Sequence, residues 1–348
     1  MNGAIIGYGT IATGHAIGYR TTKGIDVTAV VDPTPARADA ARSAGLRAYA
    51  TYEEMTDHEN PDFIDICTPP DSHAGYIERG LRDGLHVLCE KPALMPDEGR
   101  YDHLLDQIAA SDKVFYPCHN YKFAPILTEM ERIVRSPGFG DVLGARFRTL
   151  RQGHAVGVPE WNPHWRRDPL IAGGGILRDH GPHSVYLATH LTARTPLAVS
   201  CLTGSMRHDG HTGTEDTAKL IIRCDGDVRI ELDVTWSAGY RNSYYSIIGS
   251  GGWVTVENDD VQYSLGGRPH RAAFPSNFDD PRHSDWFAAM FADFLTTTRH
   301  PQRAAPLLAE SLTTSLVIDT AYASAADNGR WADLDLTPAR DLLTGAVR

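Results

Sequence analysis

Residues 3–12, GAIIGYGTIA, decide the fold of the first part of this 348-residue chain. The run Gly3–Ile6 predicts a short buried strand, and a helix-like segment follows the two glycines. Gly7 permits a tight turn, Gly9 lets the backbone approach a pyrophosphate, and Ala12 allows the helix to pack closely on the strand. This order predicts an anion-binding site at the amino terminus of the first helix.

An acid at the end of the next apolar run, Val27–Val31, strengthens this interpretation. Asp32 lies 20 residues after Ala12, where a carboxylate can accept hydrogen bonds from ribose hydroxyls. The alternative is that Asp32 only caps a helix that begins near residues 33–35. We expect a bound dinucleotide, NAD, to contact residues of the glycine loop and this acid: Gly7, Gly9, Thr10, Ile11 and Asp32.

Short apolar runs alternate with helix-like segments through the first 120 residues. The later runs are 63–67, 86–89 and 114–118, and the helix-like segments are 10–20, 35–44, 72–83 and 97–110. This alternation predicts an α/β domain with a parallel sheet and crossover helices. We therefore expect an N-terminal Rossmann domain over residues 1–122.

The pattern changes after about residue 123. A helix is predicted over 125–134, a strand over 142–151, and an aromatic and proline-rich loop to residue 169. From 197 to 265 several β-like stretches, such as LIIRC, VRIELDVTW and YYSIIG, follow one another without helices between them. We expect a second α/β domain over residues 123–348, with a large, open, mostly antiparallel sheet. Helices near 284–298 and 306–328 complete it, and Gly329 is placed to cap the last one.

Composition and the absence of targeting features indicate the cellular location of the chain and exclude some classes of partner. A net charge of −11 without a basic block makes nucleic acid and anionic membranes poor partners. The start MNGAIIGYG has no signal-peptide features, and no apolar stretch reaches membrane-spanning length, so we expect a soluble cytoplasmic protein. The cysteines form no CxxC pair, and we expect Cys67, Cys89 and Cys118 to be reduced and buried.

Two further segments carry polar residues in positions that packing alone does not explain. Glu90-Lys91-Pro92 directly follows the run HVLC. A solvated surface lysine is the ordinary alternative, but Lys91 stands between an acid and a φ-restricted proline at the expected ligand edge of the sheet. We therefore predict that Lys91 is positioned for function.

The segment GGGILRDHGPHSVYLATHL, residues 173–191, is the second. It places three glycines, an acid and two histidines at the entry of a predicted helix. The alternative is a flexible hinge followed by a cap. If Gly181 is the N-cap and Pro182 the first helical residue, Asp179 lies just before the helix and His183 in its first turn, so the two side chains can converge.

These motifs together resemble the glucose-fructose oxidoreductase/inositol dehydrogenase (Gfo/Idh/MocA) family. The resemblance rests on the GxGxxA start, TPP-D-x-H at residues 68–73, HVLCEKP at 86–92 and GGGxLxDxGxH at 173–183, and extends to DWFAAMFADFL and IDTAYASAADNGRW near the end. It implies a Rossmann domain, a second domain whose open sheet forms a subunit interface, and a substrate site between them. The run of β-like segments, with apolar residues on more than one face, predicts a homo-oligomer, a homodimer or homotetramer, with residues 197–203 and 228–236 near the interface.

The resemblance assigns roles residue by residue. In family members the counterparts of Lys91, Asp179 and His183 face the nicotinamide and the reacting carbinol carbon, so these three are the predicted catalytic residues. Oxidation of a secondary alcohol needs a base for the hydroxyl proton, for which His183 is suited, while Lys91 can stabilise the alkoxide. Further cofactor contacts are predicted at Thr68, Pro69, His73, Glu90, Lys91 and Asn120.

Substrate contacts are predicted beside this trio. Tyr121 follows Asn120 at the expected substrate mouth, and the loop HAVGVPEWNPHWRRDP, residues 154–169, offers aromatic and basic side chains suited to a sugar ring. The predicted substrate-binding residues are Lys91, Tyr121, Trp161, Trp165, Arg166, Asp179 and His183. The alternative is that the loop only packs against the first domain. The histidines show no metal-ligand spacing and HDGH, residues 208–211, is typical of a turn, so no metal is expected.

The sequence therefore predicts an NAD-dependent sugar or cyclitol dehydrogenase, with NADP a less suitable cofactor because of Asp32. A glycoside-cleaving enzyme that uses transient ring oxidation would need the same trio, so it stays open. A non-catalytic NAD-binding regulator, such as the fungal galactose-gene repressor of the same family, need not keep Lys91, Asp179 and His183. Direction and substrate are not encoded in these motifs.

Overall fold

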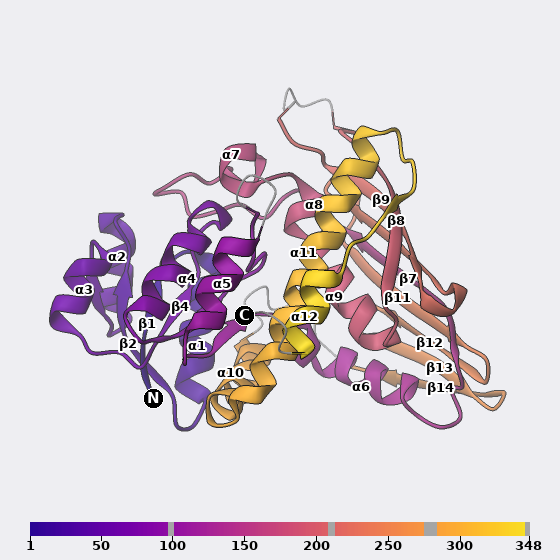
Figure 1. Cartoon of the computed structure of the whole chain (residues 1–348), viewed down its shortest axis with the longest axis horizontal. Helices are drawn as coiled ribbons and strands as arrows, with labels where there is room; N and C mark the ends of the chain where they lie inside the picture. The colour runs from indigo at the N-terminus through magenta and orange to yellow at the C-terminus, as the bar shows by residue number, and fades with distance from the viewer. Residues whose placement is uncertain (97–100, 208–212, 275–283, 345–348) are drawn as a thin grey trace.

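The computed structural model of the chain describes residues 1–96, 101–207, 213–274 and 284–344. Two β-sheets dominate it, one built from the first third of the chain and one from the rest (Figure 1). Residues 97–100 of the predicted helix 97–110 and the predicted turn at 208–211 lie outside the described residues.

The first sheet has six parallel strands in the order β3-β2-β1-β4-β5-β6. This is the order of a Rossmann fold. Its strands are β1 (Asn2–Ile6), β2 (Asp26–Val31), β3 (Arg47–Tyr49), β4 (Phe63–Ile66), β5 (His86–Cys89) and β6 (Phe115–Pro117). The helices between them are α1 (Thr10–Thr21), α2 (Pro35–Ser43), α3 (Tyr52–His58), α4 (His73–Arg82) and α5 (Asp102–Ala110). The predicted strands and crossover helices are confirmed, whereas β3 and α3 were not predicted.

Both faces of this sheet are buried, as expected for parallel strands. Alternate strand residues such as Ile5 and Ile6 enter two separate apolar clusters. One cluster is completed by α10 (Ser284–Arg299), whose Phe287 and Phe291 pack on α1, and the other by Leu308 from α11 (Ala304–Ala326). Segments from the end of the chain therefore cover the first sheet. The predicted domain boundary between residues 122 and 123 stays a proposal.

Over the described residues, the second sheet has nine strands in the order β14-β13-β12-β11-β7-β10-β9-β8-β15, and only its β7–β10 pair is parallel. The mostly antiparallel prediction is confirmed. Its strands are β7 (Val142–Leu150), β8 (Pro196–Gly204), β9 (Thr217–Cys224), β10 (Arg229–Thr235), β11 (Asn242–Gly249), β12 (Gly252–Glu257), β13 (Asp260–Leu265), β14 (Arg268–Ala273) and β15 (Ala332–Asp333).

Helices cover one face of this sheet and leave the other exposed. The remaining helices are α6 (Pro125–Val134), α7 (Pro169–Ala172), α8 (Ile176–Asp179), α9 (Gly181–Thr192) and α12 (Thr337–Thr344). Strand β9 alternates buried and exposed residues along its length. Helix α11 runs between the two sheets (Figure 1), with Leu312 in one core and Ile318 in the other. Helix α11 ends at Ala326 and its C-cap is Asp327, so the predicted end at 328 with Gly329 as the cap is wrong by two residues. Gly329 has φ +79°, and its N–H donates to Ser324 O.

One local prediction about the second segment is wrong. His180, not Gly181, is the N-cap of α9, and Asp179 ends the short helix α8. Gly181 instead serves close packing, because a Cβ at this position would lie 2.7 Å from Ile318 Cδ1 on α11. The described cysteines, all five, are free and buried. In the described ranges no helix combines the length and apolar character needed to cross a membrane.

Candidate functional site

The glycine loop after β1 forms an open cradle at the amino terminus of α1. Gly7 has φ +85°, and a Cβ added to it would lie 2.8 Å from Thr68 Cγ2, so the turn packs tightly on the segment after β4. A Cβ added to Gly9 would meet no described atom within 4 Å. Thr10 is exposed and Ile11 half-buried at the start of the helix. The loop therefore leaves room for a phosphate beside backbone N–H groups.

Asp32 lies beside this cradle and holds it in place. Its Oδ2 accepts a hydrogen bond from Tyr8 N at 2.7 Å, and its Oδ1 accepts one from Thr34 N at 2.9 Å. The second bond belongs to the turn before α2, but the N-cap of this helix is Thr34, so the alternative that Asp32 caps the helix is wrong. Arg37 donates from Nε to Tyr8 O at 2.8 Å, and its Nη1 lies 3.8 Å from Glu160 Oε1. Its charge is therefore already engaged.

The TPP and EKP segments meet through His73. This fully buried ring lies 2.9 Å from Thr68 O through Nε2 and 3.0 Å from Pro92 O through Nδ1. Burial lowers the pKa of His73, and a neutral ring has a single N–H, so it donates to one of the two carbonyls at a time. His73 thus ties together the loops that follow β4 and β5. Direct cofactor contacts of Pro69 and His73 stay predictions.

Lys91 and Asp179 form an ion pair, although 88 positions separate them in the sequence. Lys91 Nζ donates to Asp179 Oδ1 and to Asp179 O, each at 2.8 Å, and both side chains are largely buried. Arg166 Nε lies 3.4 Å from the same Oδ1. Burial alone would raise the pKa of Asp179, but the charges of Lys91 and Arg166 outweigh it and hold the pKa well below its usual value. Asp179 is therefore ionised.

A buried charged network lies behind Lys91. Glu90 Oε2 accepts from Lys91 N at 3.0 Å, and its Oε1 lies 3.1 Å from His15 Nε2. His15 Nδ1 lies 2.6 Å from Asp65 Oδ2, which also accepts from Tyr19 Oη. Burial favours neutral His15, but the charge of Asp65 outweighs it and raises the pKa of His15 well above its usual value. We interpret His15 as an imidazolium between two carboxylates, which fixes Glu90 and hence the backbone of Lys91.

Sequence reasoning missed this network. One signal was available, since Asp65 interrupts the apolar strand Phe63–Ile66 and a charge inside a parallel strand requires a partner. The ligand atoms of His15, Asp65 and Cys67 lie within 4.8 Å of one another. Because His15 already bonds directly to Asp65, we propose no metal here, and the expectation that the chain binds none stays a prediction.

His183 lies in the first turn of α9 and is buried beside the ion pair. Its Nδ1 lies 2.8 Å from Tyr186 Oη, and its ring centroid lies 4.3 Å from that of Tyr121. Burial, reinforced by the charge of Lys91, lowers the pKa of His183 well below its usual value, so the ring is neutral. Burial likewise lowers the pKa of neighbouring His180 to about 3. Tyr186 was not predicted, although its i+3 position places it on the His183 face of the helix.

Asn120 has a buried polar atom that the protein leaves unsatisfied. Within the described ranges no group donates a hydrogen bond to Asn120 Oδ1. Buried amide oxygens nearly always have a donor, so an unpaired one at the predicted cofactor site is a position for a ligand N–H group. The open cradle at Gly9 and this oxygen both fit a nicotinamide dinucleotide.

Only part of the loop 154–169 contacts the residues of the candidate site. Arg166 reaches Asp179, stacks over Trp165 at 4.2 Å and donates to Ala155 O at 3.1 Å. His154 and His164 are 3.0 Å apart through ring nitrogens. Trp161 is 47% exposed, and the structure does not bring it to the trio. A substrate contact at Trp161 therefore stays a prediction.

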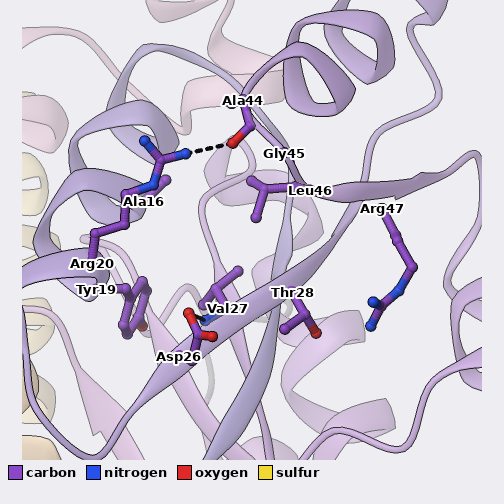
Figure 2. A pocket seen from close by; sticks show the side chains of 10 residues that line it. All are labelled: Ala16, Tyr19, Arg20, Asp26, Val27, Thr28, Ala44, Gly45, Leu46 and Arg47. Carbon is purple, nitrogen blue, oxygen red and sulfur yellow. Dashed lines mark hydrogen bonds between the residues drawn. The ribbon is translucent and has the colours of Figure 1, made fainter.

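A separate pocket lies near the amino-terminal ends of strands β2 and β3 (Figure 2). It is lined by residues of α1, of β2, of the α2–β3 connection and of the start of β3, namely Ala16, Tyr19, Arg20, Asp26, Val27, Thr28, Ala44, Gly45, Leu46 and Arg47. Arg20 closes one side by donating to Ala44 O. Asp26 begins β2 whereas Asp32 follows its end, so this pocket faces away from the predicted site.

Comparison with known proteins identifies both halves of the chain. Residues 1–117 match the family model "Oxidoreductase family, NAD-binding Rossmann fold", and residues 127–255 match the "GFO/IDH/MocA C-terminal domain". Inositol 2-dehydrogenase of Rhizobium meliloti (strain 1021) is 24% identical over 329 residues, 93% of this chain and 96% of that protein. D-glucoside 3-dehydrogenase of Escherichia coli (strain K12) is 29% identical over 192 residues, 54% of this chain and 53% of that protein.

A solved structure shares the fold over nearly the whole chain. Levoglucosan dehydrogenase in complex with NADH and L-sorbose superposes with a TM-score of 0.82 at 19% identity, covering 97% of this chain and 99% of that chain. Together with the paired domain matches, this agreement covers both sheets. The chain belongs to the Gfo/Idh/MocA family of oxidoreductases, with an NAD-binding Rossmann domain followed by the family's C-terminal domain.

Proposed function

We propose that this chain is an NAD-dependent dehydrogenase that oxidises a ring secondary alcohol of a sugar, aminosugar, cyclitol or glycoside, or runs the reverse reduction. The observation that carries the proposal is the pairing of Lys91 with Asp179 beside a neutral, buried His183. The three side chains come from opposite halves of the chain and meet at the carboxyl edge of the first sheet, where ligands of such folds bind.

His183 serves as the base in this proposal. A base must be neutral before it accepts a proton, and burial beside Lys91 holds His183 in that state. If Nδ1–H donates to Tyr186 Oη, the lone pair of Nε2 is free for the substrate hydroxyl. Burial raises the pKa of Tyr186 well above its usual value, so its hydroxyl stays protonated and neutral beside the ring.

Lys91 stabilises the oxygen that loses its proton. Its ammonium is held by two acceptors of Asp179 and has a third N–H to offer to a developing alkoxide. Asp179 keeps that ammonium in place and can also accept a hydrogen bond from a substrate hydroxyl. The side chains of Tyr121, Trp165 and Arg166 lie beside these groups and are the proposed walls of the substrate site.

NAD would be held by Gly7, Gly9, Thr10, Ile11, Asp32, Thr68 and Asn120, and when bound it accepts the hydride that leaves the carbinol carbon. Asp32 faces the place of the ribose hydroxyls, so a 2′-phosphate would meet a like charge there. Arg37 would offset little of this repulsion, because its guanidinium already contacts Tyr8 O and Glu160. We therefore propose a preference for NAD over NADP.

The relatives support this class of reaction. Proteins named inositol 2-dehydrogenase and D-glucoside 3-dehydrogenase are among the matches, and a levoglucosan dehydrogenase of the same fold binds NADH with L-sorbose. Transient ring oxidation in glycoside cleavage would use the same three residues, so it is the second candidate. A non-catalytic regulator is less favoured, because a binding protein needs neither a neutral base nor a paired lysine at this position.

A substrate panel tests the proposal. Purified protein with NAD should produce NADH, followed by its absorbance, with at least one member of a panel of free sugars, inositols, aminoglycosides, glycosides and nucleotide sugars. A deuterium on the oxidised carbon should slow the reaction if hydride transfer limits it. Tight NAD binding without turnover on any member would favour the regulator, and release of an aglycone would favour glycoside cleavage.

We also propose a cytoplasmic homodimer or homotetramer built on the open face of the nine-stranded sheet. This face exposes Leu202, Ile221 and Ile248 from three different strands, beside the cross-strand ion pair Arg146–Glu231. Exposed apolar side chains grouped on one sheet face are typical of subunit interfaces. A monomeric mass by light scattering at micromolar concentration would contradict this.

A further inference from the structure

Asp179 is carried by a segment with little structure of its own. Helix α8 is four residues long, and three glycines, residues 173–175, precede it. Gly173 has φ +71° and Gly174 has φ +158°, conformations that glycine adopts at little cost. A helix this short satisfies few of its own N–H groups. Something outside it must hold Asp179 against Lys91.

Glu215, in the connection between β8 and β9, supplies that hold. Its Oε1 accepts hydrogen bonds from Leu177 N at 2.9 Å and Gly175 N at 3.1 Å, and Gly175 N also lies 3.0 Å from Oε2. Glu215 O accepts from Ile176 N at 3.1 Å. Hydrogen bonds to a carboxylate are stronger than those between neutral groups. One residue therefore satisfies three consecutive N–H groups at the start of α8.

The carboxylate of Glu215 is itself anchored. Tyr322 Oη, on α11, donates to Glu215 Oε1 at 2.8 Å. A Cβ on Gly175 would lie 1.9 Å from Glu215 O, and one on Gly174 would lie 2.1 Å from Tyr322 Oη. The glycines thus allow Glu215 and Tyr322 to approach the backbone directly. This contact explains the triple glycine as a docking surface, in place of the flexible hinge considered from the sequence.

The hydrogen bonds made by Glu215 fix the backbone of α8 and thereby the ion pair between Lys91 and Asp179. Asp179 N donates to Gly175 O at 3.0 Å, so the place of Gly175 sets the place of Asp179. Lys91 Nζ bonds both the carboxylate and the carbonyl of Asp179, so it depends on the whole residue being in position. We propose that Glu215 is a positioning residue of the dehydrogenase site, acting through Gly175 and Asp179 on Lys91. This inference rests on the proposed function.

Three substitutions at position 215 distinguish the effect of side-chain length from the effect of the carboxylate charge. Glu215→Ala removes every side-chain acceptor and should lower kcat about a hundredfold, since a displacement of about 1 Å can have such an effect. Glu215→Asp keeps the charge but withdraws the carboxylate by one methylene, and should lower kcat about tenfold. Glu215→Gln keeps the carbonyl oxygen at the Oε1 position and should stay within about threefold of wild type. The Kd of NAD should not change in any of them.

Asp216 provides a matched control on the neighbouring residue. Its carboxylate also accepts from two backbone N–H groups, Met206 N at 2.9 Å and Arg207 N at 2.8 Å, but the described contacts do not join it to residues 173–179. Asp216→Ala should lower Tm as Glu215→Ala does and leave kcat near wild type. Wild-type kcat in Glu215→Asp, or a loss in Glu215→Gln equal to that in Glu215→Ala, would overturn the proposal. If Glu215→Ala does not fold, the Asp and Gln variants still decide.

Amide hydrogen exchange gives a readout that needs no substrate. In Glu215→Asp the amides of Gly175, Leu177 and Asp179 should lose protection, and in Asp216→Ala they should not. Unchanged protection of these amides would overturn the inference. If wild type oxidises no sugar or cyclitol while the exchange behaves as expected, the proposed function fails and the structural hold by Glu215 stands.

Discussion

The two halves of the candidate site are held in different ways. Lys91 follows a buried strand. Its backbone N–H donates to Glu90, and the ring of His15 lies between the carboxylates of Glu90 and Asp65 inside the first core. Asp179 ends a one-turn helix after three glycines and is held by Glu215 and Tyr322 from elsewhere in the chain. The first half is therefore fixed by the sheet that carries it, and the second by contacts that reach it from outside.

This difference also sets the protonation of the histidines. His15, on the Lys91 side, lies between two carboxylates and is protonated. His180 and His183, on the Asp179 side, are neutral because burial, together with the charge of Lys91, lowers their pKa values. The buried imidazoles of His15 and His183 thus adopt opposite charge states according to their neighbours. Each half can be disturbed separately.

The largest expected effect is on stability and comes from the Lys91 side. His15→Ala leaves Asp65 and Glu90 buried without the cation between them, which should reduce the free energy of unfolding by about 3–5 kcal/mol. The measurement is urea unfolding at neutral pH. The matched control is His103→Ala, because His103 is exposed and its contact with Glu78 is a surface ion pair worth at most about 1 kcal/mol. Equal losses in the two variants would contradict the buried network.

The next effect is on catalysis. Lys91→Ala should lower kcat about a hundredfold or more on the true substrate and leave the Kd of NAD nearly unchanged, because the ammonium stabilises the alkoxide and the glycine loop holds the pyrophosphate. His183→Ala should behave similarly, and Asp179→Asn more mildly. Steady-state kinetics and NAD titration are the measurements, with exposed Lys219→Ala as control. Near-wild-type kcat in both the Lys91 and His183 variants would refute the mechanism.

Acid should weaken the two halves unequally. His180 and His183 have pKa values lowered by folding, so the unfolded chain takes up protons that the fold excludes, and their stabilisation is lost as pH falls below about 6.5. The limiting slope is about 1.4 kcal/mol per pH unit for each histidine. His15 has a raised pKa and keeps its contribution in this range.

Hydrogen exchange from pH 7 to 5, corrected for intrinsic rates, would detect this difference. Amides of α9 should lose protection before those of α1. Activity should also fall as the pH falls. The kcat/KM for alcohol oxidation should fall only well below pH 6.5, because only there does His183 gain a proton. A fall of kcat/KM centred at or above pH 6.5 would show that His183 is not held neutral by its surroundings.

The smallest expected effect concerns cofactor choice and touches only the first half. Asp32→Ala should narrow the ratio of kcat/KM for NAD over NADP by about tenfold, because a like charge facing the 2′-phosphate is removed. The hydrogen bonds from Asp32 to Tyr8 N and Thr34 N are lost as well, so NAD binding should also weaken. Isothermal titration with each cofactor tests this without a substrate. Equal wild-type affinities for NAD and NADP would remove its basis.

Local sequence patterns were sufficient for much of the molecule. The glycine turn, the alternation of strands and helices, and the motifs around Lys91, Asp179 and His183 all follow from residues close together in the chain, and the first sheet and the mostly antiparallel second sheet were predicted from them. Strand β3 was missed because three residues at a sheet edge show no periodicity. The cap of α9 was misplaced by one residue because Gly181 is set by packing against Ile318, a contact distant in sequence.

The tertiary structure alone decided what holds the site and how it is charged. No spacing rule joins His15 to Asp65 and Glu90, or Glu215 to Gly175, since these residues are brought together by sheet topology and helix packing. A pKa depends on burial and on charges within a few ångströms, whatever their distance along the chain. The sequence therefore determined which groups are available for the chemistry. The fold determined which histidine is protonated, which is neutral, and what keeps Asp179 against Lys91.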